Sequence, residues 1–346
     1  MKEKLPLLGI SAGDPAGVGP EISAKALLNE ETYTICRPLV VCDGWIMEQI
    51  VGLCKFDLKV NKISDPSEGK YEYGTLDVLD MKNVDRDEFR FNEVAAMTGK
   101  ASYEYVAKVI ELALCGEIDA TITGPIHKEA IQLAGYNYAG HTEIYADLTN
   151  TQDYSMMLAD AHFRVVHVST HVSLLDAIKR VKKERILKVI ELAYDALKNM
   201  DIESPRIAVA GLNPHAGEHG LFGREEIEEI IPAIEEAKSM GINAEGPFPP
   251  DTIFPKMNGG QYDIVVCMYH DQGHIPTKLL GFTYNHEKEI WEGLSGVNIT
   301  LGLPIIRVSV DHGVAFDKGG KGEANAESMI QAIRYGARFC NKKMQQ

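Results

Sequence analysis

Short apolar runs alternate with helical patterns along the whole chain, and this alternation constrains the fold more than any other feature. The runs are rich in β-branched residues, as buried strands usually are. They lie at residues 7–11, 39–42, 120–123, 165–168, 207–210 and 264–267. Between them, apolar residues recur at helical spacing, most clearly at 93–115, 182–199, 225–239 and 326–339. Strands that alternate with helices predict an α/β fold with a largely parallel sheet.

Length and charge limit the class of protein. A chain of 346 residues is long enough for about two domains. Its net charge of -15 argues against a nucleic-acid or anionic-membrane partner, although a few local cations would suffice for a phosphorylated substrate. No apolar run approaches the length of a membrane span, and the N-terminus lacks a signal-peptide pattern. The 6 cysteines are dispersed without a CxxC pair, which predicts reduced thiols and a cytoplasmic location.

Three of the predicted strands are followed by a histidine within a few residues. His171 follows 165–168, His215 follows 207–210, and His270 follows 264–267. Ligand sites in α/β sheets lie beyond the carboxyl ends of strands, so we expect these side chains to converge. A single histidine is more often a hydrogen-bonded structural residue, but three together favour a metal site. Neutral imidazoles suit divalent first-row metals, and three protein ligands with an open position are typical of catalysis.

Other polar residues complete the predicted site. Asp251 and Asp271 are candidates for carboxylates that support the metal. Both residues, together with Lys278, are also candidates for the general base, and the sequence leaves that choice open. The candidates for binding the anionic groups of a substrate are His141, Thr142, Lys278, Asn298 and Arg307.

The glycine-rich segment GDPAGVGPEI after the first strand does not match a known nucleotide motif. No Lys-Ser or Lys-Thr pair follows its glycines, which excludes a P-loop. Ile22 occupies the position where the dinucleotide fingerprint requires its third Gly or Ala. The segment is therefore either a tight strand-to-helix turn or a loop in which Asp14 and the backbone amides bind a ligand. Residues that bind a cofactor are not identified.

Several motifs closely resemble the 4-hydroxythreonine-4-phosphate dehydrogenase family. They occur in the family's order from Asp14 to Gly313 and thus over nearly the whole chain: GDPAGVGPEI, TGPIHKEAI, GHTEIYAD, GLNPHAGE, GPFPPDT, MYHDQG and GVNITLGLPIIRVSVDHG. The resemblance implies an enzyme that depends on NAD and a divalent metal. Such an enzyme oxidises the 3-hydroxyl of a 4-phosphorylated four-carbon acid, and the β-keto acid then loses carbon dioxide.

The resemblance also assigns residues and architecture. His171, His215 and His270 match the family's metal ligands, and the five anion-binding candidates match its substrate positions. The implied fold has two α/β/α domains with a cleft, similar to isocitrate and isopropylmalate dehydrogenases and without a Rossmann fingerprint. We expect one domain from 1–125 plus 296–346, and a second from 126–295 that carries most of the site. The family implies a homodimer whose partners share each active site.

Two departures from the pyridoxine-pathway members bear on the substrate. HIPTKLLGF follows MYHDQG, and TYNHEKEIWEGLS intervenes before GVNIT. Both resemble the branch that acts on D-threonate or D-erythronate 4-phosphate and yields dihydroxyacetone phosphate. The alternative substrate is 4-hydroxy-L-threonine 4-phosphate, of pyridoxal phosphate biosynthesis. Alternatives of another class are a metallohydrolase or lyase and a sugar-phosphate binding protein without activity. The metal (zinc, magnesium or another ion) and the choice of NAD or NADP stay open.

Overall fold

The structure, a computed structural model, describes residues 5–343 except 161, 282, 287–289 and 293–295. The chain divides into two compact units, and the first is discontinuous in sequence. Unit 1 consists of Met1–Thr151 and Leu303–Gln346, and unit 2 consists of Gln152–Gly302. Strands and helices alternate in both units, so the predicted α/β class is confirmed. Among the described residues, no helix combines the length and the apolar character needed to cross a bilayer.

The sheet of unit 1 is parallel throughout. Its strands run in the order β3-β4-β2-β1-β5-β14. Their bounds are β1 Leu7–Ser11, β2 Arg37–Cys42, β3 Lys59–Ile63, β4 Thr75–Asp80, β5 Ala120–Thr123 and β14 Arg307–Val310. The helices are α1 Gly19–Ala26, α2 Thr32–Ile35, α3 Gly44–Leu53, α4 Ala96–Leu114, α5 Lys128–Leu133, α6 His141–Leu148 and α12 Glu327–Lys343, with short 3₁₀ turns η1 Pro66–Glu68 and η4 Phe316–Lys318.

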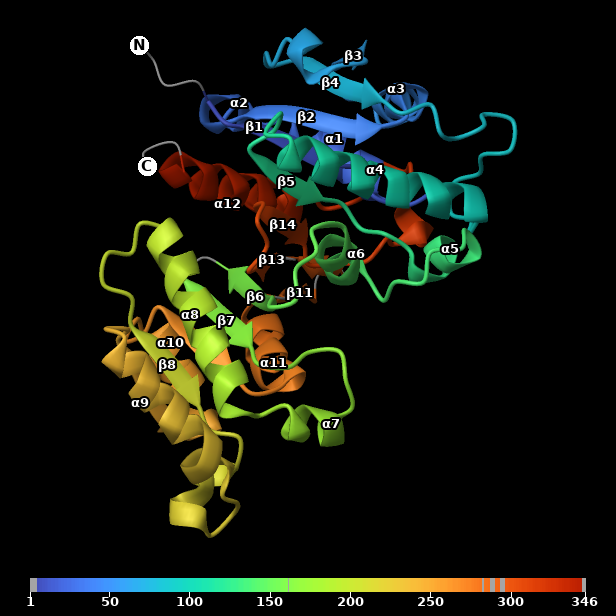
Figure 1. Cartoon of the computed structure of the whole chain (residues 1–346). Coiled ribbons are helices and arrows are strands. Elements are labelled where there is room, and N and C mark those ends of the chain that lie inside the picture. The colour runs from blue at the N-terminus through green and yellow to red at the C-terminus, as the bar shows by residue number, and fades with distance from the viewer. Residues whose placement is uncertain (1–4, 161, 282, 287–289, 293–295, 344–346) are drawn as a thin grey trace. The chain divides into compact units, whose positions relative to one another are not determined.

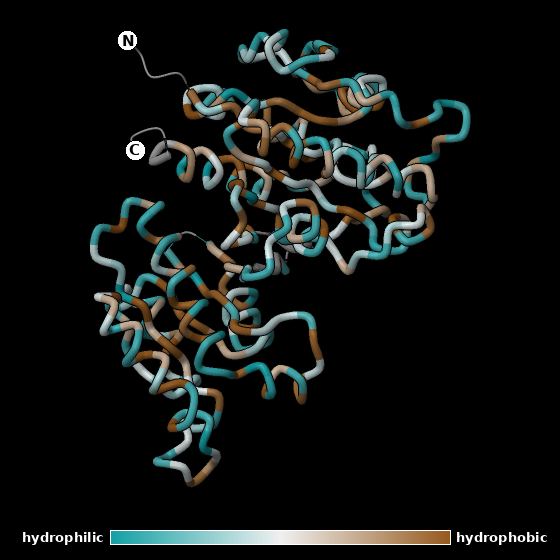
Figure 2. Tube along the Cα trace, in the orientation of Figure 1, coloured by the Kyte–Doolittle hydropathy of each residue, from teal (hydrophilic) through white to brown (hydrophobic). Residues whose placement is uncertain are grey.

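The helices of unit 1 bury its sheet. α4 packs on β1 and β5, and α12 packs on β5 and β14 (Figure 1). The apolar face of α4, including Val106 and Ile110, packs against Ile131 of α5 and against Ile144 and Tyr145 of α6. Figure 2 shows the hydrophobic segments running through the strands at the centre of the unit. The helical spacing of apolar residues in 93–115 therefore predicted the buried face of α4 correctly.

Unit 2 has a mixed sheet in the order β13-β6-β7-β10-β8-β9. β6 pairs antiparallel with β13 and β7, whereas β7, β10, β8 and β9 are parallel. The strands are β6 Ser155–Asp160, β7 Phe163–His167, β8 Ile207–Ala210, β9 Ala244–Phe248, β10 Ile264–Cys267 and β13 Val297–Leu301, with a separate antiparallel pair, β11 Thr283–Asn285 and β12 Ile290–Glu292. The helices are α7 Leu174–Lys179, α8 Lys183–Asn199, α9 Ile231–Ser239, α10 Pro250–Asn258 and α11 His270–Gly281, with η2 Pro214–Gly220 and η3 Glu226–Ile230.

The compact units differ from the expected domain boundaries at two points. Residues 126–151, expected in the second domain, belong to unit 1, because α5 and α6 pack against α4. Residues 296–302, expected in the first domain, belong to unit 2, because β13 pairs with β6. Both differences arise from contacts between segments that are far apart in sequence.

Asp251 lies in the first turn of α10, just after two consecutive prolines. Pro250 occupies the first helical position, where its missing N–H is not needed and its fixed φ suits the helix. The prolines before it therefore start a helix.

The glycine-rich segment after β1 is a close-packed turn. A Cβ on Gly13 would overlap the Pro125 carbonyl, and a Cβ on Gly19 would overlap that of Ala12. Asp14 is fully buried, and its Oδ1 accepts a hydrogen bond from the Ala16 amide at 3.0 Å. Burial raises the pKa of Asp14 to about 6, against the hydrogen bonds from Ala16 and Thr98, which lower it. These contacts support the interpretation as a tight turn.

Candidate functional site

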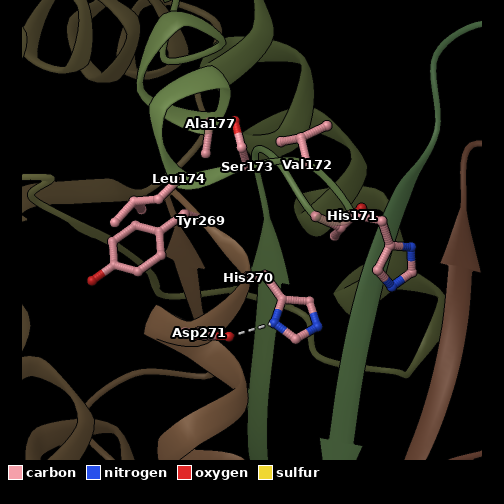
Figure 3. Close-up of a pocket in the computed structure, with 9 residues that line it drawn as sticks. His171, Val172, Ser173, Leu174, Ala177, Tyr269, His270 and Asp271 are labelled. Carbon is pink, nitrogen blue, oxygen red and sulfur yellow. Dashed lines mark hydrogen bonds and ion pairs between the residues drawn. The ribbon is translucent and has the colours of Figure 1, made fainter.

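The candidate site of unit 2 lies where β7 and β10 end. The two strands are parallel neighbours, and the last residue of each, His167 and Cys267, are paired in register. A pocket of about 500 Å³ opens beyond them. Its lining includes His171, Leu174, Tyr269, His270 and Asp271 (Figure 3). The pocket is thus formed by the segment after β7, the start of α7 and the first turn of α11.

Two of the predicted metal ligands line this pocket together. The ring centroids of His171 and His270 are 5.7 Å apart. Nδ1 of His270 donates a hydrogen bond to Oδ1 of Asp271 at 2.7 Å, on the side of the ring away from His171 (Figure 3). A neutral imidazole with its proton on Nδ1 carries a lone pair on Nε2. A carboxylate that fixes the tautomer in this way is the usual partner of a metal-binding histidine.

His215 does not line this pocket. It lies in η2, where the residues from His215 to His219 form a run of left-handed backbone. Its side chain is 64% exposed, and Nδ1 is 3.4 Å from Oε2 of Glu218. Within the described part of the chain, no group of three His, Cys, Asp or Glu residues is placed to hold a metal ion. One chain therefore brings together His171 and His270 but not the third predicted ligand.

The segment before His215 is nevertheless tied to the same region. Gln272 of α11 donates from Nε2 to the Gly211 carbonyl at 2.8 Å. The buried Glu226 accepts hydrogen bonds from the amides of Leu212 and Asn213 at 2.8 and 2.7 Å. These contacts fix the end of β8 while the His215 side chain stays exposed.

Two further histidines, which the sequence analysis did not select, lie beside His270. The rings of His270 and His274 are stacked, with centroids 3.5 Å apart and planes 11° apart. His167 is fully buried, and its ring is 4.8 Å from that of His274. Burial, followed by the charge of His274, lowers the pKa of His167 to about 3, so this ring is neutral. The spacing of four residues between His270 and His274 on a helix was the available signal.

Lys278 and Asn298 belong to the same unit. Lys278 lies two helical turns after His270 on α11, at the spacing that keeps His270, His274 and Lys278 on one face. Asn298 lies on β13, and its Nδ2 is 2.8 Å from Sδ of Met156. The Met156 carbonyl accepts a hydrogen bond from Nδ1 of His167 at 3.2 Å, so Asn298 is linked to the histidines through one residue.

Unit 1 contains the remaining anion-binding candidates. Arg307 is buried at the start of β14, 5.4 Å from the ring of Tyr145, and donates from Nη2 to the Thr123 hydroxyl at 3.3 Å. Burial lowers the pKa of Arg307 to about 10, so the guanidinium stays charged at neutral pH. His141 and Thr142 begin α6. Burial and the charge of Arg307 hold the pKa of His141 well below its usual value, which leaves a neutral imidazole beside a cation.

The three candidates for the general base differ in position. Asp251 is exposed in α10 and does not line the pocket of His171 and His270. Asp271 lines the pocket, but one of its carboxylate oxygens accepts the Nδ1 proton of His270. Lys278 lies on the helical face that carries His270. In this geometry the Asp271 carboxylate orients the His270 ring, and Lys278 on α11 stays a candidate for the general base.

Comparisons with known proteins cover nearly the whole chain. A family model described as "Pyridoxal phosphate biosynthetic protein PdxA" matches residues 34–336. A relative from Oceanobacillus iheyensis is 48% identical over 332 residues, 95% of this chain and 96% of the relative. A relative from Clostridium botulinum is 44% identical over 337 residues, 97% and 98% of the two chains. Both are provisionally named D-threonate 4-phosphate dehydrogenase.

A solved structure is similar over the same extent. The 4-hydroxythreonine-4-phosphate dehydrogenase from Burkholderia phymatum has a TM-score of 0.84 and 43% identity, and the match covers 97% of this chain and 99% of the other.

Proposed function

We propose, since the chain belongs to the PdxA family of dehydrogenases, that it oxidises a 4-phosphorylated four-carbon 3-hydroxy acid with NAD and a divalent metal. Membership of a dehydrogenase family implies a nicotinamide cofactor. The proposed substrate is D-threonate or D-erythronate 4-phosphate, in agreement with the names of relatives at 44% and 48% identity. Loss of the C3 hydride and the hydroxyl proton gives a 3-keto acid. Loss of carbon dioxide and protonation at C2 then give dihydroxyacetone phosphate.

The observation that carries this proposal is the pair of imidazoles in one pocket. The rings of His171 and His270 lie 5.7 Å apart, and the hydrogen bond to Asp271 leaves the Nε2 lone pair of His270 available. Imidazole nitrogens and a supporting carboxylate suit a divalent first-row cation. Such a cation would lower the proton affinity of the substrate hydroxyl and polarise the ketone that follows.

The exposed His215 bears on how the ligand set is completed. Two ligands from one chain leave room for a third, and His215 is on the surface where a second chain can reach it. We propose that His215 completes the set in a homodimer, so that each site uses residues of both partners. The family resemblance and the position of His215 both support this arrangement.

The cations of each unit are suited to the two anionic groups of the substrate. Arg307 offers a planar fork that can bind a phosphate or carboxylate through two hydrogen bonds, with the neutral His141 beside it. Lys278 offers a compact charge. We propose these three side chains for the phosphate and carboxylate. Only the neutral form of Lys278 can take the proton of the substrate hydroxyl, so this second proposed role requires that Lys278 first lose its own proton. Asn298 and Thr142 stay proposed substrate contacts.

Exposed apolar side chains support the homodimer. Leu174, Leu175 and Ile178 of α7 are 60%, 66% and 38% exposed. Ile275 and Leu279 of α11 are 64% and 79% exposed. Apolar side chains gathered on two helices of one unit are typical of a surface that another protein covers. The dispersed cysteines, without a CxxC pair, are the basis for proposing a cytoplasmic location.

The test is a substrate comparison with purified protein. NADH formation is measured with Mn²⁺, Mg²⁺ or Zn²⁺ and each of three acids: D-threonate 4-phosphate, D-erythronate 4-phosphate and 4-hydroxy-L-threonine 4-phosphate. We expect turnover of the first two, release of dihydroxyacetone phosphate, and loss of activity with a chelator. His171→Ala and His270→Ala should lower kcat/KM by more than about 100-fold, since they remove direct ligands. His162→Ala, at an exposed histidine outside the pocket, is the matched control.

A second candidate substrate has support of its own. Solved structures at 43% and 39% identity bear the name 4-hydroxythreonine-4-phosphate dehydrogenase. Turnover of the aminated acid alone would assign this protein to that reaction instead. Metal binding without NADH formation from any of the three acids would contradict the dehydrogenase proposal and favour a metallohydrolase or lyase.

A further inference from the structure

Three imidazoles are packed together at the start of α11. Only one of them, that of His270, belongs to a predicted metal ligand. The rings are those of His167, His270 and His274. Each donates its Nδ1 proton to an oxygen atom: His167 to the Met156 carbonyl, His270 to Asp271, and His274 to the His270 carbonyl. Nδ1 is therefore protonated in all three rings, and the neutral form of each ring carries its lone pair on Nε2.

The contact between His270 and His274 is the closest in this group. The centroids are 3.5 Å apart at an interplanar angle of 11°, so one face of the His270 ring is covered by the His274 ring. The hydrogen bond from His274 Nδ1 to the His270 carbonyl, at 2.9 Å, prevents the His274 ring from turning away. The other fixed point of His270 is its own bond to Asp271 at 2.7 Å.

His167 supports this pair from the protein interior. Its ring is 4.8 Å from His274 and 6.3 Å from His270. Its Nε2 is buried and meets no hydrogen-bond partner within normal geometry. A buried polar atom of this kind costs stability, and an apolar residue would fill the same space without that cost. Gly273 is matched to the ring, because a Cβ there would be 2.5 Å from His167 Nε2.

We propose that His274 is a positioning residue for His270, and that His167 holds His274 in place from the core. The stacked ring restricts the rotation of His270 so that its Nε2 points to one place in the pocket, while Asp271 sets the tautomer. This inference rests on the proposed metal role of His270 but concerns only how this chain's own side chains are arranged. Residues that orient a metal ligand typically change metal affinity by about 10- to 100-fold when they are removed.

The experiment uses three variants and two readouts on the full-length protein. His274→Ala removes the ring, His274→Phe keeps a flat ring but loses the hydrogen bond, and His162→Ala is the control. His162 is also a histidine of unit 2 whose ring nitrogen meets a backbone carbonyl, that of Asn258 at 3.2 Å, but it is exposed and lies outside the group. The first readout is Mn²⁺ affinity by titration calorimetry without substrate. The second is the ring ¹⁵N spectrum of the metal-free protein. It shows which tautomer each histidine adopts and whether its ring signals are averaged by exchange between tautomers.

We expect His274→Ala to weaken Mn²⁺ binding by about 10-fold or more. The His270 ring signals should also average between tautomers, because a ring that rotates freely spends less time hydrogen-bonded to Asp271. His274→Phe should recover most of both properties, and His162→Ala should change neither. Unchanged affinity and spectra in His274→Ala would overturn the proposal. Equal losses in the Ala and Phe variants would also overturn it, since His274 would then act through its nitrogen.

The spectrum of the metal-free protein keeps this test separate from the proposed function. If the wild type binds no Mn²⁺, the metal role of His270 fails, but the ring signals still show whether His274 fixes His270. If the His274 variants melt at lower temperature, His167→Leu tests the proposal with a fold that stays stable, because leucine fills the core without a buried polar atom. Loss of the His270 tautomer in this variant, with melting unchanged, supports the proposal; an unchanged His270 signal contradicts the part assigned to His167.

Discussion

Asp14 and Arg307 show two outcomes of burying an ionisable side chain. Asp14 accepts hydrogen bonds from Ala16 and Thr98, but desolvation dominates and raises its pKa to about 6. Arg307 is buried as well, but it lies over the Tyr145 ring and donates to Thr123. Its pKa falls only to about 10, which keeps the charge. The first arrangement suits a structural turn, and the second suits the binding of an anion.

Asp14→Asn tests the cost of the buried carboxylate. The pKa of about 6 in the folded protein exceeds the ordinary value of 3.8, so the folded state holds a proton that the unfolded state has lost between these pH values. Stability from this group is therefore present at low pH and is lost as pH rises through about 6. Because asparagine does not titrate, the variant should gain about 3 kcal/mol relative to the wild type between pH 4 and pH 7.

Urea unfolding at a series of pH values measures this difference. Asp57→Asn, at an exposed position, is the control and should stay within about 0.5 kcal/mol of the wild type. A stability difference between Asp14→Asn and wild type that does not vary with pH would contradict the expectation.

At the scale of elements, α11 connects most of the features of unit 2. Its first turn carries His270 and Asp271 into the pocket, and one face continues to His274 and Lys278. Gln272, on its buried side, accepts the Met268 amide hydrogen bond at 2.6 Å and donates to the Gly211 carbonyl. The helix therefore links the ends of β10 and β8. A substitution at its buried face should shift the side chains that α11 contributes to the pocket.

Gly273→Ala tests the packing of α11 on β7. A new Cβ would be 2.5 Å from His167 Nε2, 3.0 Å from Cys267 Sγ and 3.1 Å from Val165 Cγ2, so the helix or the ring must shift. We expect a loss of about 1–3 kcal/mol from overpacking, measured by urea unfolding. Gly52 provides a matched control, because it lies in α3 with nothing within 4 Å of the added Cβ. Gly52→Ala should stabilise by about 0.5–1 kcal/mol; equal effects of the two changes would refute the packing argument.

At the scale of the molecule, two separate cores and a strong negative charge shape the behaviour of the chain. Each unit buries its own sheet beneath its own helices, with clusters around Val106 and Tyr145 in unit 1 and around Val265 and Met257 in unit 2. A net charge of -15 keeps copies apart in general, so association requires a specific apolar surface. The exposed leucines and isoleucines of α7 and α11 form the candidate for that surface.

Leu279→Glu tests this surface. Leu279 is 79% exposed, and a carboxylate there would be buried without a partner if another chain covers it. We expect the wild type to sediment as a dimer and the variant to shift toward monomer, with an unchanged far-UV spectrum. Leu53→Glu, at a leucine 53% exposed at the end of α3, should leave the dimer intact. A dimer that survives Leu279→Glu would place the interface elsewhere.

Local patterns in the sequence were sufficient for most of the elements. The strands at 120–123, 207–210 and 264–267 have the predicted bounds, because buried β-branched runs end where polar residues begin. The same patterns predicted the α/β class and placed His171, His215 and His270 after strand ends. The motifs that resemble the 4-hydroxythreonine-4-phosphate dehydrogenase family pointed to the dehydrogenase family that the comparisons then showed.

Only the tertiary structure decided which of these side chains meet. β7 and β10 are neighbours in the sheet, which brings His171 to His270, whereas the left-handed turn after β8 leaves His215 exposed. The four-residue spacing of His270 and His274 on one helix was a signal in the sequence, but the contact of His167 with His274 was not, because it depends on how α11 packs against β7. The sequence determined the chemistry available at each strand end, since that depends on residues adjacent in the chain. Proximity depends on strand order, turn geometry and helix packing, which adjacent residues do not encode.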